Sequence, residues 1–304
     1  MILDPNADEP NARTVPRSPR PTGEQHCPNC RVDDVHPVFT LGSARVVACN
    51  GCGLQFAASY PEIETVGAEM YGAAYFTRAI REQEARRRIF GQLLDEIDAV
   101  LGDTRPGRRL LDVGAGEGTL LQVAAQRGWS PVGIDVARDM VQHVQQTLGL
   151  PMHHGTLEEV ALEPRSFDAV ILNHVLEHVR DPVRTLRHIA TLLDPGGVVR
   201  VEVPNLASLS SRLKSAQSRL GLKSHPWKHY SVEHHFWFFT PGTLAATFRS
   251  AGLEVVRLST PARQWGAGAA RMSNRLHDRL GWGKHIVAYG RPAPSVSERS
   301  SGPT

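Results

Sequence analysis

The sequence predicts an α/β protein with a doubly wound parallel sheet and a smaller cysteine-rich module in front of it. Three observations lead to this prediction. From residue 108 to about residue 260, short apolar segments alternate with single helical segments, as they do in a parallel sheet covered on both faces. A glycine-rich turn follows the first apolar segment. All four cysteines lie between residues 27 and 52, in two C-x-x-C pairs.

Composition excludes several other classes of protein. Of the 304 residues, 41% are hydrophobic and 21% are charged, which allows a sizeable core and rules out a fully disordered chain. The 34 basic and 31 acidic side chains leave a net charge of +3, too small to indicate a nucleic acid or a membrane as partner. No apolar run reaches the ~18 residues of a spanning helix, and the N-terminus lacks the apolar stretch of a secretory signal. We therefore expect a cytoplasmic protein without a membrane partner.

The chain is predicted to consist of a main domain and several smaller parts. Residues 1–25 contain many prolines and almost no large apolar side chain, so we expect them, like residues 291–304, to be a disordered tail. Residues 26–58 hold the cysteines. Residues 59–107 form a linker with an amphipathic capping helix around 78–101. Residues 108–290 form the main domain, which contains an insertion at 205–238.

Within the main domain, local patterns mark the individual elements. Asp181-Pro182 and Thr240-Pro241 each combine an N-cap residue with a proline in the first turn of a helix. Residues 193–197, Leu-Asp-Pro-Gly-Gly, end one helix and begin a strand. The predicted strands are 109–113, 132–135, 168–173, 198–203, 254–258 and 285–290, and the predicted helices lie near 118–127, 137–148, 181–193 and 240–251.

Residues 110–121, LLDVGAGEGTLL, have the pattern of a strand, a glycine turn and a helix. Gly114 and Gly116 would let a ligand approach the backbone, although a tight turn without a ligand is the plainer interpretation. Asp112 would repel a pyrophosphate but suits a cationic group, such as an α-amino group or a sulfonium. Asp135 ends the second strand, where a carboxylate accepts hydrogen bonds from both hydroxyls of a ribose. An adenosyl ligand with an amino-acid tail satisfies both acids.

These segments resemble the class I S-adenosylmethionine-dependent methyltransferases. The resemblance covers roughly residues 108–260 and also rests on 132–141, 154–182, 192–205 and 239–255. It implies a Rossmann-like sheet of seven strands, the last antiparallel, with S-adenosylmethionine as cosubstrate. The residues implied to hold this cosubstrate are Asp112, Gly114, Ala115, Gly116 and Gly118 for the methionine part, Asp135 for the ribose, Thr156 and Leu157 near the adenine, and Asn173 at the end of the fourth strand.

Two features qualify this resemblance. Many members of the family have an acid after the third strand for the adenine amino group, whereas this chain has Gly155-Thr156-Leu157. Tyr71 and Tyr75-Phe76 resemble a segment that closes over the cosubstrate in some relatives. The alternative is that these three aromatic residues pack against the linker helix.

Two histidines are candidates for the general base of methyl transfer to a hydroxyl. His174 follows the fourth strand, at the edge of the sheet where open α/β folds bind ligands, although it could equally be a wall of the cosubstrate site. His235 belongs to a stretch similar to the family's H-x-x-x-F-T-P, and we favour it as the base. Glu177 and His178 recur in the family pattern and are expected to brace the loop.

The insertion at 205–238 is rich in basic and aromatic side chains. Its basic residues, with no acid before Glu233, are Arg212, Lys214, Arg219, Lys223 and Lys228, and its histidines are His225, His229, His234 and His235. The plainer interpretation is a solvated basic helix followed by an aromatic-packed loop. The alternative is a substrate lid whose aromatic planes suit sugar rings and whose cations suit a phosphate or carboxylate. The histidine spacings match no common metal-ligand pattern.

The two cysteine pairs predict a zinc ribbon. Cys27 and Cys30 form one C-x-x-C knuckle, and Cys49 and Cys52 form the other, so four thiolates can surround one tetrahedral ion. With four protein ligands the zinc would be structural. Disulfides or a redox pair are disfavoured by the lack of a secretory signal and of a thioredoxin-like context, whereas iron remains chemically allowed.

We therefore expect an enzyme that methylates a small-molecule acceptor at a hydroxyl of a saccharide or a secondary metabolite, with anionic and sugar-linked acceptors among the candidates. The alternatives are a C-methyltransferase of a deoxysugar, a nucleic-acid methyltransferase that grips through the ribbon and the basic insertion, and a catalytically idle binding protein. Residues 173–176 are N-H-V-L and not the N-P-P-Y typical of enzymes that methylate nucleobase or amide nitrogens. This difference disfavours a nucleic-acid substrate.

Overall fold

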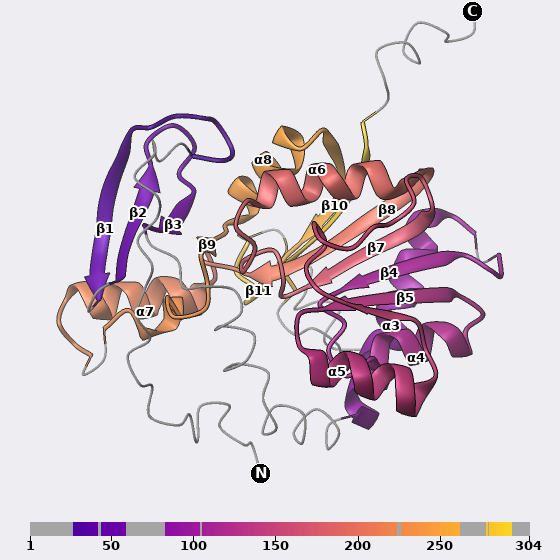
Figure 1. Cartoon of the computed structure of the whole chain (residues 1–304). Helices are drawn as coiled ribbons and strands as arrows, with labels where there is room; N and C mark the ends of the chain where they lie inside the picture. The colour runs from indigo at the N-terminus through magenta and orange to yellow at the C-terminus, as the bar shows by residue number, and fades with distance from the viewer. Residues whose placement is uncertain are drawn as a thin grey trace, which may run out of the picture.

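The fold is centred on a seven-stranded sheet in the order β10-β11-β8-β7-β4-β5-β6 (Figure 1). The computed structural model describes residues 27–41, 44–58, 83–103, 105–223, 226–261, 278 and 280–293. The strands of this sheet are β4 (Arg109–Val113), β5 (Ser130–Asp135), β6 (Met152–His154), β7 (Phe167–Asn173), β8 (Leu193–Pro204), β10 (Leu253–Ser259) and β11 (His285–Pro292).

Pairing within this sheet confirms the predicted topology. β4 lies between β5 and β7 and is parallel to both, and β8 is parallel to β7. β11 is antiparallel to β8 on one side and to β10 on the other, as predicted for the last strand. The inner strands are apolar along most of their length because helices cover both faces of the sheet. The carboxyl ends of β4, β5 and β7 therefore meet at one edge.

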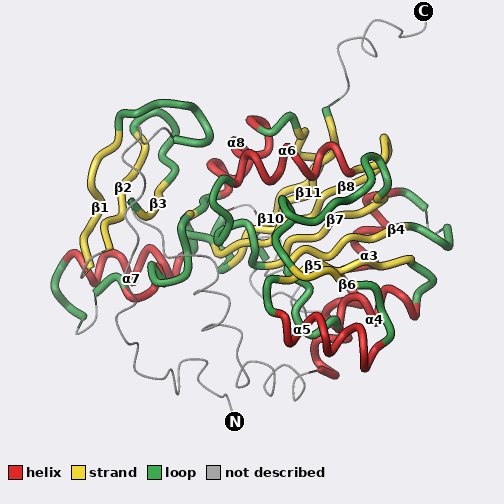
Figure 2. The backbone as a smooth tube through the Cα atoms, viewed as in Figure 1, coloured by secondary structure: helices red, strands yellow, loops and turns green. Residues whose placement is uncertain are grey.

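Two layers of helices enclose the sheet (Figure 2). One layer contains α6 (Pro182–Leu192) and α8 (Pro241–Ser250), and the other contains α3 (Gln83–Leu101), α4 (Thr119–Gln126) and α5 (Arg138–His143). Asp181 and Thr240 cap α6 and α8 as predicted, each accepting a hydrogen bond from a backbone N–H of the first turn. The helix predicted over 137–148 is α only to His143 and continues as a π-helical turn, η1 (Val144–Leu148).

The cysteine-rich part forms a second, four-stranded sheet in the order β1-β2-β3-β9. β1 (Val35–Leu41) and β2 (Ala44–Cys49) form an antiparallel hairpin between the two cysteine pairs, and β3 (Gln55–Ala57) pairs with β2. The fourth strand, β9 (Trp237–Phe238), comes from the insertion and pairs with β3. The sequence did not predict β3 or β9, because strands of two and three residues carry almost no periodicity.

The insertion packs against this small sheet. It contains α7 (Leu209–Arg219) and a 3-10 turn, η2 (Lys228–Tyr230), before β9. The rings of Phe39 and Trp227 stack with centroids 4.5 Å apart, and the Tyr230 hydroxyl donates to Gln55 over 2.9 Å. Figure 1 shows α7 lying beside β1 and β2, at the end of the molecule away from α4 and α5.

The small sheet also shares an apolar core with the main domain. Phe56 and Leu54 belong to the same buried cluster as Leu172 and Val201 of the central sheet. Asn29 lies between the first two cysteines, and its side chain donates to the carbonyl of Thr243 in α8 over 3.0 Å.

Several expectations lie outside the described residues. These are the terminal tails for the most part, the segment with Tyr71, Tyr75 and Phe76, and His225. Within the described ranges, no helix combines the length and the apolar character needed to cross a membrane.

Candidate functional site

The glycine turn after β4 is packed on two sides and open on the third. Gly114 and Gly116 both have φ in the left-handed region, at +73° and +53°. A Cβ on Gly114 would lie 2.6 Å from Cγ2 of Val175, in the loop that follows β7. A Cβ on Gly116 would meet no atom of the described residues within 4 Å. The turn is therefore held against the loop at 174–178, and beside Gly116 it leaves a space that is free of described atoms.

Three carboxylates surround this turn. Asp112 is 4% exposed, and the pKa of its carboxyl is raised well above its usual range by burial and by the nearby charges of Asp135 and Glu117. Glu117 forms an ion pair with Arg86 over 2.6 Å. Among the described residues, neither Asp112 nor Asp135 has an ion-pair partner at the turn, so a cationic ligand in the free space would relieve the repulsion between them.

Asp135 is oriented by the backbone. Its carboxylate accepts hydrogen bonds of 2.8 Å from the backbone N–H groups of Gly116 and Ala137. Burial raises the pKa of Asp135, and these two hydrogen bonds oppose the shift. Each carboxylate oxygen keeps a second lone pair for a ligand hydroxyl.

The segment after β6 lies beside Asp135 at the end of β5. Gly155 donates its backbone N–H to the carbonyl of Asp135 over 3.0 Å, which brings Thr156 and Leu157 beside the second strand. The Thr156 backbone N–H donates to Glu159, and Leu157 is buried in the core. The structure therefore gathers Asp112, Gly114, Ala115, Gly116, Gly118, Asp135, Thr156 and Leu157 around one edge of the sheet.

The end of β7 carries a buried polar network. His174 has a φ of +54°, and its backbone N–H donates to the carbonyl of Glu202 in β8 over 2.9 Å. The Asn173 side chain accepts a hydrogen bond from Arg200, whose guanidinium also pairs with Glu202 over 2.8 Å. Arg200 is fully buried. Asn173 and His174 are therefore fixed in direction by a charged pair within β8.

His174 is held by a carboxylate on its own loop. Nδ1 of its ring lies 3.2 Å from Oε1 of Glu177, which is 1% exposed. Nε2 lies 3.7 Å from Oε1 of Glu202, and this carboxylate oxygen is also 3.1 Å from Nδ1 of His285. The His174–Glu177 contact fits an Nδ1–H donor, which leaves Nε2 as the basic nitrogen. The His174 side chain is 40% exposed and therefore accessible to a substrate.

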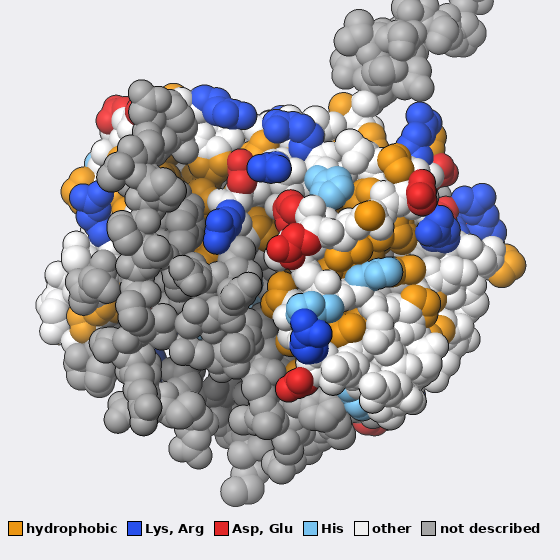
Figure 3. All heavy atoms as spheres, viewed as in Figure 1, with side chains coloured by type: hydrophobic (Ala, Val, Ile, Leu, Met, Phe, Trp, Pro, Cys, Tyr) orange, Lys and Arg blue, Asp and Glu red, His pale blue; other side chains and the backbone are white. Residues whose placement is uncertain are grey.

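The insertion brings His235 to the same glutamate. The backbone N–H of Phe236 donates to the carbonyl of Glu177 over 2.9 Å. The His178 ring donates through Nδ1 to the carbonyl of His234 over 2.8 Å, and its centroid is 4.9 Å from that of His235. Oε2 of Glu177 is buried without a hydrogen-bond partner. Figure 3 shows several histidine side chains on one face of the molecule, whereas Glu177 itself is buried.

The pKa values of His174 and His235 are shifted in opposite directions. Burial lowers the pKa of His174, but the hydrogen bond to Glu177 and the charges of Glu177 and Glu202 outweigh it, and the pKa is raised overall. Burial lowers the pKa of His235 to about 4. Burial alone would raise the pKa of Glu177, but the neighbouring histidines lower it to about 2, so Glu177 is ionised at neutral pH. His174 is therefore the stronger base.

The sequence did not predict the roles of Glu202, Arg200 and His285 in this network. A signal was present, because Arg200 and Glu202 alternate with valines in an otherwise apolar strand, a pattern that places two charges on one face of a buried sheet. Their pairing with each other could not be read from that pattern alone.

The four cysteine sulfurs form one cluster, with their Sγ atoms all within 4.8 Å of one another. Cys27 lies 3.5 Å from Cys52, and Cys30 lies 3.4 Å from Cys49. Cys27 and Cys49 are almost fully buried, and backbone N–H groups approach their sulfurs. Four thiols grouped at this spacing fit a tetrahedral zinc ion, and the cluster leaves no open coordination position for a substrate.

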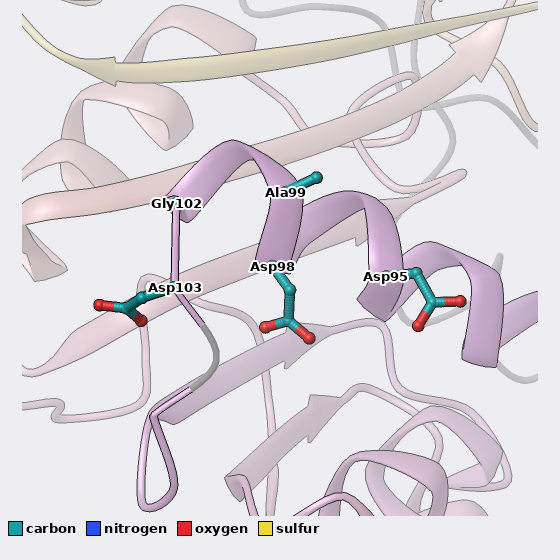
Figure 4. Close-up of a pocket in the computed structure, with 5 residues that line it drawn as sticks. All are labelled: Asp95, Asp98, Ala99, Gly102 and Asp103. Atoms are coloured by element: carbon teal, nitrogen blue, oxygen red, sulfur yellow. The ribbon is translucent and has the colours of Figure 1, made fainter.

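The described part of the chain has a further hollow, which does not belong to this site. It lies between the end of α3 and the segment that enters β4, and Asp95, Asp98 and Asp103 point into it (Figure 4). Asp98 and Asp103 both contact Arg108. The hollow is at the opposite edge of the sheet from the glycine turn and carries no candidate catalytic group.

Comparisons with known proteins agree with this geometry. The sequence profile of a family described as "Methyltransferase domain" matches residues 85–258. The ubiquinone biosynthesis O-methyltransferase of Xanthomonas campestris pv. campestris is 31% identical over 176 residues, which cover 56% of this chain and 72% of that protein. The enzyme of the same name from Ruegeria pomeroyi is 34% identical over 175 residues, with coverages of 55% and 69%.

A solved structure of a putative sarcosine dimethylglycine methyltransferase from Galdieria sulphuraria has a TM-score of 0.49 and 17% identity, and covers 69% of this chain and 87% of its own. The family profile spans more than half of the chain, and the glycine turn, its acids and strands β4 to β8 lie within the matched region. The chain belongs to the S-adenosylmethionine-dependent methyltransferases.

Proposed function

We propose that this enzyme transfers a methyl group to a hydroxyl oxygen of a small-molecule acceptor, a saccharide or a secondary metabolite. The observation that carries the proposal is the 3.2 Å contact between Nδ1 of His174 and the buried carboxylate of Glu177. Val175, the next residue, packs over Gly114 of the glycine turn. A base oriented in this way, beside the cosubstrate site, is what a neutral hydroxyl acceptor needs. The curated relatives named above are O-methyltransferases, which supports oxygen as the acceptor atom.

In this proposal the glycine turn and its acids hold the cosubstrate. Asp112 faces the cationic methionine part, with the backbone of Gly114, Ala115, Gly116 and Gly118 close to it, and Asp135 binds the ribose hydroxyls. Thr156 and Leu157 flank the adenine, and Asn173, at the end of β7, contributes to the cosubstrate site. Support comes from the repulsion among the carboxylates and from the free space beside Gly116.

The chemistry requires alignment and one proton transfer. S-adenosylmethionine, when bound, supplies the methyl group on a sulfonium. Nε2 of His174 accepts the proton of the acceptor hydroxyl as the carbon–oxygen bond forms. The ionised Glu177 keeps Nδ1–H in place and stabilises the imidazolium that results, as the carboxylate of a catalytic triad does.

We propose the opposite order of the two candidate bases from the one favoured on the sequence. From the sequence we favoured His235, yet burial lowers its pKa to about 4, which makes it a weak base at neutral pH. His174 has a raised pKa and a half-exposed ring. We therefore assign the proton transfer to His174 and a supporting place in the acceptor wall to His235.

We also propose that the four cysteines bind one structural zinc ion. The ribbon would then hold the insertion, because β3 begins three residues after Cys52 and pairs with β9. The pairing of β9 with the ribbon changes our expectation that the insertion is a movable substrate lid. The aromatic part of the insertion stacks on the ribbon through Phe39 and Trp227, so it would act as a fixed wall beside the acceptor.

The function can be tested with a panel of acceptors. The purified enzyme is incubated with S-adenosylmethionine that carries a deuterated methyl group, together with saccharides, phenols and aliphatic alcohols. S-adenosylhomocysteine should form with a hydroxyl acceptor, and the label should appear on its oxygen by NMR. Compounds with that hydroxyl already methylated serve as substrate controls, and His188→Ala serves as a control variant beside His174→Ala. Turnover only with nucleic acids, or a label on carbon or nitrogen, would refute the proposal.

A further inference from the structure

Helix α7 is amphipathic, but its two faces are reversed relative to an ordinary surface helix. Its serines face the protein and its leucines face solvent. Ser215 and Ser218 face inward: the Ser215 hydroxyl contacts Nε2 of His229 at 3.1 Å, and the Ser218 hydroxyl accepts from the backbone N–H of Trp227 over 3.1 Å. Ser218 is buried. The serine hydroxyls on this face of the helix therefore have hydrogen-bond partners inside the molecule.

The outward face is apolar. Leu209 and Leu213 are 53% and 58% exposed, and Leu220 and Leu222 are 72% and 71% exposed. The spacings of 4 and 7 residues from Leu209 to Leu213 and on to Leu220 place three of them on one stripe of the helix. Of the large apolar side chains exposed in the described part of the chain, most belong to this stripe and its continuation.

Positive charge surrounds the stripe. Arg212, Lys214 and Arg219 are exposed on the same helix, and Lys223 and Lys228 follow it. The sequence from 205 to 232 contains no aspartate or glutamate. In a protein whose basic and acidic residues nearly balance, this segment concentrates five cations around exposed leucines.

We propose that α7 and the residues to Lys228 form a docking surface for an anionic lipid bilayer. Exposed leucines flanked by lysine and arginine are typical of helices that lie in the membrane interface, where apolar side chains enter the acyl boundary and cations meet anionic headgroups. A protein partner fits less well, since the cores of protein interfaces are depleted in lysine and enriched in aromatic side chains. A convex helix also offers no groove for a peptide.

The inference departs from our expectation of no membrane partner. That expectation rested on the small net charge and on the lack of a spanning helix, and neither concerns a local patch. The docking surface belongs to the insertion that also delivers His235 to Glu177, so a bound bilayer would lie near the acceptor side of the enzyme. Lipid binding does not depend on the identity of the acceptor and is tested without turnover.

The test is co-sedimentation of the full chain with vesicles. Vesicles of phosphatidylcholine containing about one third phosphatidylglycerol should bind the protein, and pure phosphatidylcholine should bind it much less. The double variant Leu213→Ser, Leu220→Ser should lose most of the binding. Arg212→Glu should weaken it roughly fivefold or more, since each cation near an anionic surface contributes on the order of 1 kcal/mol.

Matched controls keep the test specific. Val256→Thr removes an exposed apolar side chain in β10, and Arg184→Glu reverses an exposed charge in α6. Both should bind vesicles like the unchanged protein, and all variants should keep its affinity for S-adenosylmethionine. The proposal is overturned if no vesicle binds, or if the leucine variant binds as well as its control. It is equally overturned if the leucine substitutions instead abolish a dimer seen by light scattering.

Discussion

Glu177→Gln should move the acidic limb of the pH–rate profile to lower pH. In the unchanged enzyme the carboxylate of Glu177 lies 3.2 Å from Nδ1 of His174 and raises the pKa of that histidine. Glutamine keeps a carbonyl oxygen to accept the Nδ1–H bond but removes the charge. The variant therefore separates the electrostatic role of Glu177 from its role in orienting the ring.

The magnitude follows from the surroundings of His174. Loss of a carboxylate within about 4 Å lowers the pKa of a histidine by roughly 1–3 units. Glu202 remains 3.7 Å from Nε2, and the ring is 40% exposed, so we expect about 1–2 units, or roughly 1.4–2.7 kcal/mol. Since kcat/KM needs neutral His174, it rises with pH through this pKa. In the variant the rise occurs at lower pH, and the plateau is lower because the base is weaker.

The assay is the pH dependence of kcat/KM between about pH 5 and pH 9, followed by release of S-adenosylhomocysteine. Glu163→Gln, at an exposed position, is the control. The new amide would place an N–H where Oε2 is buried without a partner, at a cost of about 1–3 kcal/mol, so thermal unfolding and cosubstrate affinity are measured as well. A lower plateau with an unmoved acidic limb would refute His174 as the base.

The remaining predictions concern the metal, the cosubstrate and the two histidines. Cys49→Ser should lose the one zinc ion found by metal analysis and should destabilise the ribbon, because a three-thiolate site binds zinc more weakly. Gly116→Val should abolish S-adenosylmethionine binding by filling the free space, and Asp135→Ala should weaken it by roughly 1.5–3 kcal/mol in calorimetry. His174→Ala should lower turnover by roughly 10²–10⁴-fold with unchanged cosubstrate affinity, whereas His235→Ala should lower it less.

Each of these predictions would be contradicted by a specific experimental result. Four titratable thiols and no metal in the folded protein would exclude the zinc site. Unchanged calorimetric affinity in both cosubstrate variants would exclude the glycine turn as the binding site. Near-normal turnover in both histidine variants would mean that the acceptor is already nucleophilic or loses its proton elsewhere.

The sequence predicted the central sheet because its signals are local. The strand at Arg109–Val113 was predicted residue for residue, since an apolar run ends there at a glycine turn. The caps at Asp181 and Thr240 were predicted from single side chains that accept from the backbone N–H three residues on. The four cysteines were likewise recognisable, because metal-ligand spacing is set within each knuckle.

The acceptor side was harder to predict because its contacts join distant parts of the chain. Glu177 touches the segment at 234–237, which follows it by almost 60 residues, and nothing local to either segment indicates the other. The pairing of β3 with β9 spans a still longer separation and fixes the insertion to the ribbon. From the sequence we interpreted the ribbon as a separate module, and we considered a substrate lid as one interpretation of the insertion.

The placement of β9 joins the ribbon to the loop that carries Glu177. One edge of β9 pairs with β3, while Trp237 of β9 and the preceding Phe236 donate backbone hydrogen bonds to the carbonyl of Glu177. The Trp237 indole also donates to the carbonyl of Val179 over 2.7 Å. Loss of order in the ribbon would free β9 and the wall beside His174, because two residues of strand cannot hold themselves in place. The glycine turn and Asp135 would keep their bonds, since these lie within the central sheet. In our proposal, the ribbon therefore supports the acceptor side of the active site and leaves the cosubstrate side to the parallel sheet.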